Sequence, residues 1–135
     1  MRTERNNPFL VIAASSGLLA VGLGAFGAHG LKKLVDVYSL QIWDKGVQYQ
    51  FYHSLALSVI YMLLQRQPSS HLRNAGWCFL AGIVGFSGSL YLLATISLNG
   101  MPGKLLGPIT PIGGSLFILG WVFVLLESIK DRKSL

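Results

Sequence analysis

Charged residues are scarce in this sequence. Asp, Glu, Lys and Arg make up 12% of its 135 residues, whereas about a quarter of an ordinary soluble domain is charged. Hydrophobic residues make up 52% and the mean hydropathy is +0.54, so lipid is the expected solvent. No stretch has the polar or Pro/Ser-rich composition of a linker or disordered tail, which predicts a single membrane domain over residues 1–135.

Residue patterns for catalysis and metal binding are also lacking. The lone cysteine, Cys78, excludes an intrachain disulfide and a thiolate metal cluster. The sequence contains no Walker loop, no His-Glu-x-x-His motif and no nucleophile elbow. The acids nearest the apolar runs, Asp36, Asp44 and Glu127, lie at the edges of those runs and do not suggest an ion-coupled pump. We therefore expect neither an enzyme nor a bound cofactor or metal.

Four long runs without Asp, Glu, Lys or Arg occupy most of the chain. A helix needs about 20 mostly apolar residues to cross the hydrocarbon core of a bilayer, and each run is long enough. They predict an all-α fold, an integral membrane four-helix bundle with spans near 8–28, 46–65, 75–97 and 110–127. The first run also resembles a signal peptide, but its length favours a retained anchor.

The basic residues define the expected topology. The formal net charge is +6, but the basic residues fall in short clusters between apolar runs rather than along one face, which argues against a nucleic-acid partner. With four spans, seven Lys and Arg residues share the side of both termini and four lie opposite, which predicts cytoplasmic termini. The first group comprises Arg2, Arg5, Arg66, Arg73, Lys130, Arg132 and Lys133, and the second comprises Lys32, Lys33, Lys45 and Lys104.

The segment 30–45 between the first two spans has its own pattern. Apolar residues recur in it at helical spacing while Lys32, Lys33 and Asp36 take other faces. We expect a short amphipathic helix in the membrane interface, with Tyr38 and Trp43 at headgroup depth. The alternative is a short helix packed as a lid on the bundle.

Small residues predict how the spans pack. They recur at every fourth position in two of the spans, and small residues allow transmembrane helices to approach closely. We therefore expect spans one and three to make the closest contact, although a hinge or a permeation path is the alternative use of such glycines. The two stripes are Ser16, Ala20, Gly24 and Ala28, and Ala81, Gly85 and Ser89.

Polar and aromatic residues gather in the predicted outer half of the bundle. His53 lies seven positions beyond Gly46, about 10 Å into its span, so it is expected to face the interior, and Tyr49 shares its face. A neutral histidine bonded to a tyrosine or a carbonyl is one interpretation, and a ligand or proton site is the other. The candidate cluster comprises His29, Gln48, Tyr49, His53 and Tyr91.

Two helix ends in this half carry their own hypotheses. His29 is expected to cap the last carbonyls of its helix, and the alternative is a pair with His53 that ligates haem or copper. Thr110 is expected to cap the last span, with Pro111 in its first turn.

Four outer motifs together resemble the YgdD-like small inner-membrane proteins, the UPF0382-like family with domain of unknown function 423. The resemblance covers nearly the whole chain and implies a bacterial inner-membrane protein with four helices and no established activity. The motifs are Leu23-Gly24-Ala25-Phe26-Gly27-Ala28-His29-Gly30-Leu31, Trp43 with Gln48-Tyr49-Gln50-Phe51-Tyr52-His53-Ser54-Leu55-Ala56, Ser87-Gly88-Ser89-Leu90-Tyr91, and Leu106-Gly107-Pro108-Ile109-Thr110-Pro111-Ile112-Gly113-Gly114.

The function expected from these patterns is that of a non-enzymatic membrane protein that packs against lipid, partner proteins or further copies of itself. The alternative is binding of a small molecule, a lipid or a cofactor by the outer polar cluster. Transport by an oligomer is a further alternative, and it would need a polar path through the inner half as well.

Overall fold

The computed structural model describes residues 6–133, and these residues form helices joined by short turns, with no strand among them. The all-α class expected from the sequence is confirmed. In chain order, the elements are α1 (Phe9–His29), the 3₁₀ turn η1 (Leu31–Lys33), α2 (Val37–Arg66), α3 (Ser70–Gly82), the π-helical turn η2 (Ile83–Ser87), α4 (Gly88–Ala94), α5 (Ile96–Asn99), α6 (Gly103–Leu106) and α7 (Ile109–Lys133).

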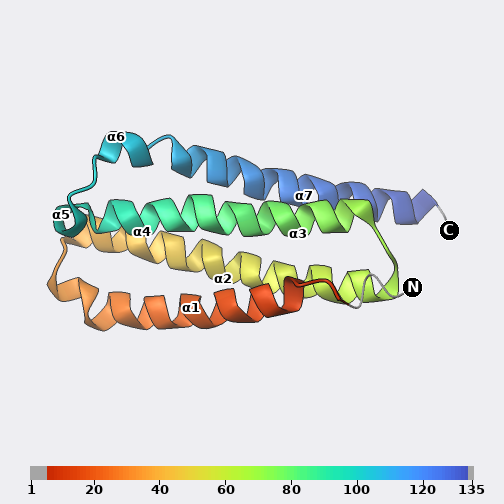
Figure 1. Cartoon of the computed structure of the whole chain (residues 1–135), viewed down its shortest axis with the longest axis horizontal. Helices are drawn as coiled ribbons and strands as arrows, with labels where there is room; N and C mark the ends of the chain where they lie inside the picture. The colour runs from red at the N-terminus through yellow and green to blue at the C-terminus, as the bar shows by residue number, and fades with distance from the viewer. Residues whose placement is uncertain (1–5, 134–135) are drawn as a thin grey trace.

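The long helical segments run side by side (Figure 1). The helices α3 and α4 are joined through η2 into one of these segments, and α1, α2 and α7 are the others. α1 and α7 lie at opposite edges, with α2 and the α3–α4 segment between them. The turn from α2 to α3 lies at the same end as the start of α1 and the end of α7.

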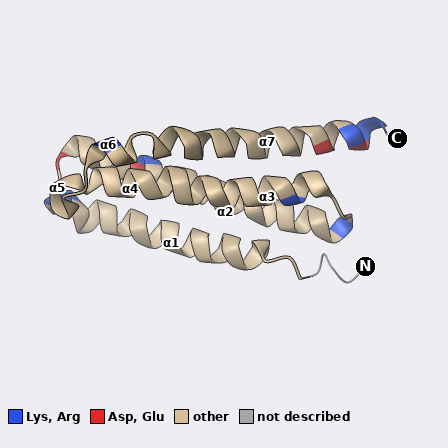
Figure 2. Cartoon of the chain, turned by 45° about the horizontal axis from the view of Figure 1, so that its top comes forward, with Lys and Arg blue, Asp and Glu red and all other residues tan. Residues whose placement is uncertain are grey.

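Three helical segments are long and apolar enough to cross a membrane: Phe9–Lys33, Ser70–Ala94 and Gly103–Lys133. Lys, Arg, Asp and Glu lie toward the two ends of the molecule and leave a wide uncharged middle (Figure 2). α2 is as long as its neighbours but is not among the three, because it carries more polar side chains than they do.

The expected contact between spans one and three is wrong. α1 packs mainly against α2, and α3 packs mainly against α7. Ser16 and Gly24 of the first stripe face α2, and Gly85 of the second faces Gly113 of α7. Ala28 and Ala81 are exposed. Small residues marked positions of close approach, but they did not identify the partner helix.

The separate interfacial helix is also wrong, because residues 37–45 form the first part of α2. The Asp36 carboxylate caps this helix by accepting a bond from the Ser39 N–H at 2.7 Å. No proline or second cap interrupts the chain before Arg66, and Trp43 fixes this segment to α1 by donating from Nε1 to the Leu23 carbonyl at 2.9 Å. α2 therefore begins nine residues before the predicted span at 46.

Aromatic side chains fill the gaps that glycines leave between segments. Phe9 of α1 lies over Gly76 of α3, and Phe79 of α3 lies against Gly120 of α7. α7 approaches the backbone of η2 closely at Gly113, where an added Cβ would overlap the backbone of Phe86. This contact positions one wall of the groove described below.

Candidate functional site

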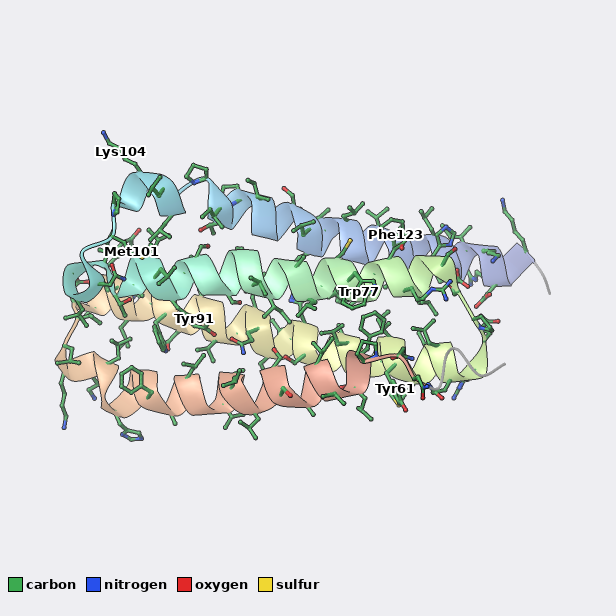
Figure 3. The ribbon with its side chains drawn as sticks, viewed as in Figure 1. Tyr61, Trp77, Tyr91, Met101, Lys104 and Phe123 are labelled. Carbon is green, nitrogen blue, oxygen red and sulfur yellow. The ribbon has the colours of Figure 1, made fainter. Side chains whose placement is uncertain are left out.

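The polar side chains of α2 belong to two groups, which face different neighbouring helices. The first, which we call the Gln50 cluster, consists of Ser16 of α1, Gln50 and Ser54 of α2, and Tyr91 of α4. Gln50 is buried, donates from Nε2 to the Ser16 carbonyl at 2.9 Å and accepts from the Tyr91 hydroxyl at 2.6 Å. Figure 3 shows Tyr91 on the side of α4 that faces α1 and α2. One amide side chain thus links three helices.

The Gln50 cluster is completed by two serines. The Ser54 hydroxyl lies 2.7 Å from the Ser16 hydroxyl and 2.7 Å from the Gln50 carbonyl. The Ser54 hydroxyl is placed to donate to either oxygen, and its single proton serves one of them at a time. Within residues 6–133, every fully buried side-chain nitrogen and oxygen has a partner. The buried polar groups of the cluster are therefore all hydrogen-bonded within the protein, and we call this the closed side of α2.

The second group surrounds His53, which is buried and turned toward α3 and α7. Its Nδ1 lies 2.8 Å from the Tyr49 carbonyl, and its Nε2 accepts from Trp121 Nε1 at 3.2 Å. Because Nε2 accepts, the proton is on Nδ1 and the imidazole is neutral. The ring stacks on Phe117 with centroids 3.6 Å apart and planes 10° from parallel. Both nitrogens are occupied, so His53 has no lone pair free for a metal.

A groove of about 420 Å³ opens beside His53, between α2, η2 and α7. We call it the His53 groove. None of its lining residues is charged, and most are aromatic or small. Several on α7, Ile118 and Trp121 among them, are exposed and would face lipid in a membrane. The lining comprises Tyr49, His53, Phe86, Pro111, Gly114, Ser115, Phe117, Ile118 and Trp121.

Tyr49 differs from the other polar side chains of the groove. Its ring contacts Phe86, at a centroid distance of 4.8 Å, and Phe117, at 6.1 Å, and these two rings also contact each other at 5.6 Å. Its hydroxyl has no hydrogen-bond partner among the residues that the structure describes. The groove thus offers one free donor on a fixed ring.

A second groove, of about 280 Å³, lies between α1 and α2 and is almost wholly apolar. Gln48 is at its edge and is exposed. The groove is lined by Ala20, Val21, Gly24, Ala25, Val47, Gln48, Phe51 and Tyr52.

The predicted outer cluster is therefore divided. Tyr49 and His53 share the His53 groove, Tyr91 belongs to the Gln50 cluster, and Gln48 faces the groove between α1 and α2. His29 is exposed at the end of α1. Ser54 touches Ser16, so His53 is level with Ser16 and lies about 20 Å along the helix axis from His29. A histidine pair that ligates haem or copper is wrong.

The expected helix cap at Thr110 is corrected as well. α7 begins at Ile109, so Thr110 is already helical, and its Oγ1 lies 2.6 Å from the Ser89 hydroxyl. The pair fastens the start of α7 to α4. Ser89, which the small-residue stripe assigned to a contact with the first span, makes this contact instead. Pro111 accepts a bond from the Ser115 hydroxyl at 2.8 Å through its carbonyl.

One ionisable pair, in which only the acid is buried, is not predicted by the sequence. Glu127 of α7 is 5% exposed, and its Oε2 lies 3.0 Å from His71 Nδ1 of α3. The Ser69 hydroxyl also bonds this carboxylate, and Gln67 Nε2 donates to Asp131 at 3.0 Å. These contacts join α7 to the α2–α3 turn. The predicted topology places Glu127 and His71 at the same end of the bundle, and this is the feature of the sequence that could have predicted the pair.

A family model described as "Protein of unknown function (DUF423)" matches residues 23–114. The UPF0382 membrane protein YwdK of Bacillus subtilis is 46% identical over 124 residues, which cover 90% of this chain and 96% of that protein. A UPF0382 membrane protein of Staphylococcus epidermidis is 47% identical over 123 residues, 90% of this chain and 95% of the relative. No solved structure matches.

Proposed function

This chain belongs to the DUF423 family of membrane proteins, and we propose that it is a non-enzymatic, four-span protein of the bacterial inner membrane that interacts with lipid or partner proteins. The family assignment confirms the resemblance found in the sequence. The four spans, the sidedness and the role are the proposal.

The proposal requires α2 to cross the membrane although its composition is more polar than that of the other long segments. Its polar residues Gln50, His53 and Ser54 are buried against neighbouring helices, where each has a hydrogen-bond partner. Between residues 51 and 62 the exposed face of the same helix is apolar, at Phe51, Leu55, Val59 and Met62, whereas Gln48 is exposed before this stretch. A helix with polar groups inside and apolar groups outside suits a bilayer.

The arrangement of the ends supports cytoplasmic termini. The start of α1, the α2–α3 turn and the end of α7 lie at one end (Figure 1), so five of the seven basic residues counted above lie at that end and the group of four lies at the other. The five are Arg66, Arg73, Lys130, Arg132 and Lys133. Arg2 and Arg5 of the larger group lie outside the described residues. Lys104 of the smaller group points away from the helices at the α6 end (Figure 3).

One observation supports the non-enzymatic role: the polar groups in the interior are hydrogen-bonded to one another, and the exposed side chains of the edge helices are apolar. The Gln50 cluster uses its polar groups on one another. The edge helices expose large apolar side chains, such as Leu18 and Val21 of α1 and Ile118 and Leu125 of α7. Such surfaces suit lipid, another membrane protein or a second copy of the chain.

The second candidate function is binding of a small lipophilic molecule, and the His53 groove is the observation that favours it. This candidate does not use the outer cluster as predicted, because His29, Gln48 and Tyr91 lie elsewhere. Transport by an oligomer stays a prediction without a specific observation in its favour.

Cysteine accessibility tests the four-span topology. In a Cys78→Ser background, single cysteines replace exposed residues at the turns: Lys33, Ser70 and Ser97. With four spans, a membrane-impermeant maleimide labels Lys33→Cys and Ser97→Cys from outside, whereas Ser70→Cys reacts after permeabilisation only. If α2 does not cross, Lys33→Cys and Ser70→Cys label from the same side, and the proposal is overturned.

A further inference from the structure

The His53 groove has the properties of a ligand site rather than of a packing defect. Its volume of about 420 Å³ lies within the range of small-molecule pockets, roughly 300–1,000 Å³, and aromatic side chains line it from three helical elements. The π-helical turn η2 forms one of its walls through Phe86. Such turns are rare in helices and are frequent at functional sites.

The charge of the groove limits the ligand to a neutral molecule. No Asp, Glu, Lys or Arg lines it, and both nitrogens of the neutral His53 ring are engaged. A charged headgroup there would lack a counter-charge within the membrane, which is costly. Phosphate-bearing headgroups are therefore disfavoured inside the groove.

The free hydrogen-bonding group of the groove is the Tyr49 hydroxyl. It has no partner among the described residues, although the Tyr49 ring is packed against Phe86 and Phe117. Polar groups in a bilayer normally find a partner within the protein. A hydroxyl left free beside a groove suits a ligand that brings an acceptor such as a carbonyl oxygen.

The shape of the groove indicates a planar headgroup with an apolar tail. Pro111 and Trp121 lie ten residues apart on α7, so the groove runs about 15 Å along that helix, roughly half of the hydrocarbon core. Its aromatic walls favour edge and face contacts with a flat ring. Its α7 side is exposed toward lipid, where a tail would lie.

We infer that the His53 groove binds a membrane quinone, with the ring between Phe86 and Trp121 and one quinone carbonyl accepting a hydrogen bond from the Tyr49 hydroxyl. A quinone is neutral and planar, carries carbonyl acceptors and partitions into the bilayer, so it meets each of the four conditions. The inference rests on the proposed membrane-spanning topology, because the groove must open to lipid.

The test uses the full-length protein in phosphatidylcholine nanodiscs, titrated with a short-tailed benzoquinone and, separately, with a short-tailed naphthoquinone. Quenching of tryptophan fluorescence reports binding, and a Trp121→Phe variant identifies the part that comes from the groove, because Trp43 and Trp77 are not in its lining. We expect saturable quenching by at least one quinone. Tyr49→Phe removes the free hydroxyl, and we expect it to raise the Kd by roughly five- to tenfold.

Two matched controls separate binding from folding. Tyr91→Phe makes the same change in the Gln50 cluster and is expected to leave the Kd within about twofold, since Tyr91 is not part of the groove lining. Gly114→Leu fills the groove, and a Cβ at this position would lie at an ordinary 3.6 Å from Phe86. Gly22→Leu adds the same side chain where no atom lies within 4 Å. We expect Gly114→Leu, but not Gly22→Leu, to abolish saturable quenching.

Three outcomes would overturn the inference. These are quenching that does not saturate with either quinone, quenching that survives Gly114→Leu in a folded variant, and equal displacement of the quinone by a saturated alkyl alcohol, which would make the groove a general site for lipid tails. If Gly114→Leu does not fold, Tyr49→Phe decides, and an unchanged Kd counts against the inference. A correct cysteine-labelling pattern without quinone binding would leave the proposed topology intact.

Discussion

The two sides of α2 have similar residues in different roles. Gln50 and Ser54 face α1 and α4, and each is the sequence neighbour of Tyr49 or His53, which face η2 and α7. Each side includes one tyrosine, but the Tyr91 hydroxyl is bonded within the protein and the Tyr49 hydroxyl is not. The first side is closed by hydrogen bonds, whereas the second is held by backbone and ring contacts around an open groove. A polar residue in a membrane helix can therefore serve stability or binding according to the neighbour that it faces.

The largest expected effect tests whether the open side of α2, which faces the His53 groove, depends on the backbone contact between α7 and η2. Gly113→Leu places a side chain where even a Cβ overlaps the η2 backbone, so α7 must move away from η2. We expect the free energy of unfolding to fall by about 3 kcal/mol or more, measured by SDS-titrated unfolding in detergent. Gly114→Leu, one residue on, points toward the groove and should cost less than about 1 kcal/mol. Equal losses at the two glycines would show that the groove has no room.

The next effect tests whether the closed side depends on hydrogen bonds. Gln50→Leu keeps a similar volume but leaves the half-buried Tyr91 hydroxyl without its acceptor. We expect a loss of about 2 kcal/mol in the same unfolding assay. Gln48→Leu makes the same change at an exposed position on the groove between α1 and α2, and its effect should stay within about 0.5 kcal/mol. A small effect at Gln50 would remove the distinction between the two sides.

The two tyrosines give a sharper version of the comparison, because the same atom is deleted from each. Tyr91→Phe removes a bond of 2.6 Å and is expected to lower the free energy of unfolding by about 1 kcal/mol. Tyr49→Phe removes a hydroxyl that no described residue contacts, and without added quinone its effect should be within about 0.5 kcal/mol. Thermal melting of both variants in one detergent checks the difference. A larger loss at Tyr49 would indicate a structural partner for its hydroxyl.

The parts of this comparison that could be predicted from sequence are those set by helical spacing. The apolar runs predicted long helices, and the four-residue interval predicted that Tyr49 and His53 share a face. Spacing does not say which helix lies opposite that face. For this reason His29, Gln48 and Tyr91 were grouped with Tyr49 and His53, although they lie at other places in the bundle.

The remaining errors have the same physical origin. Ser16 and Gly85 lie on surfaces that permit close approach, but small residues do not specify which helix packs against them. α2 packs against Ser16, and α7 packs against Gly85. The early start of α2 depends on the Asp36 cap and on the Trp43 bond to α1, and the second of these is a tertiary contact. The burial of Glu127 likewise depends on the packing of α7 against α3 and the α2–α3 turn, which no local pattern specifies.

The smallest expected effect tests how the closed side is built. Hydrogen bonds between membrane helices contribute about 0.6 kcal/mol on average, so the 2.7 Å contact between Ser16 and Ser54 should be weak alone. In a double-mutant cycle of Ser16→Ala and Ser54→Ala, we expect a coupling of about 0.6 kcal/mol from unfolding in detergent. The matched cycle pairs Ser16→Ala with Ser115→Ala on the open side, where the hydroxyl donates within α7, and should be additive. Coupling in the first cycle and additivity in the second would mean that the closed side is a network of individually weak hydrogen bonds. Loss of Gln50 would then leave the other members of the network without their partners. Additivity in both cycles would instead reduce the Gln50 cluster to a single amide that bridges three helices.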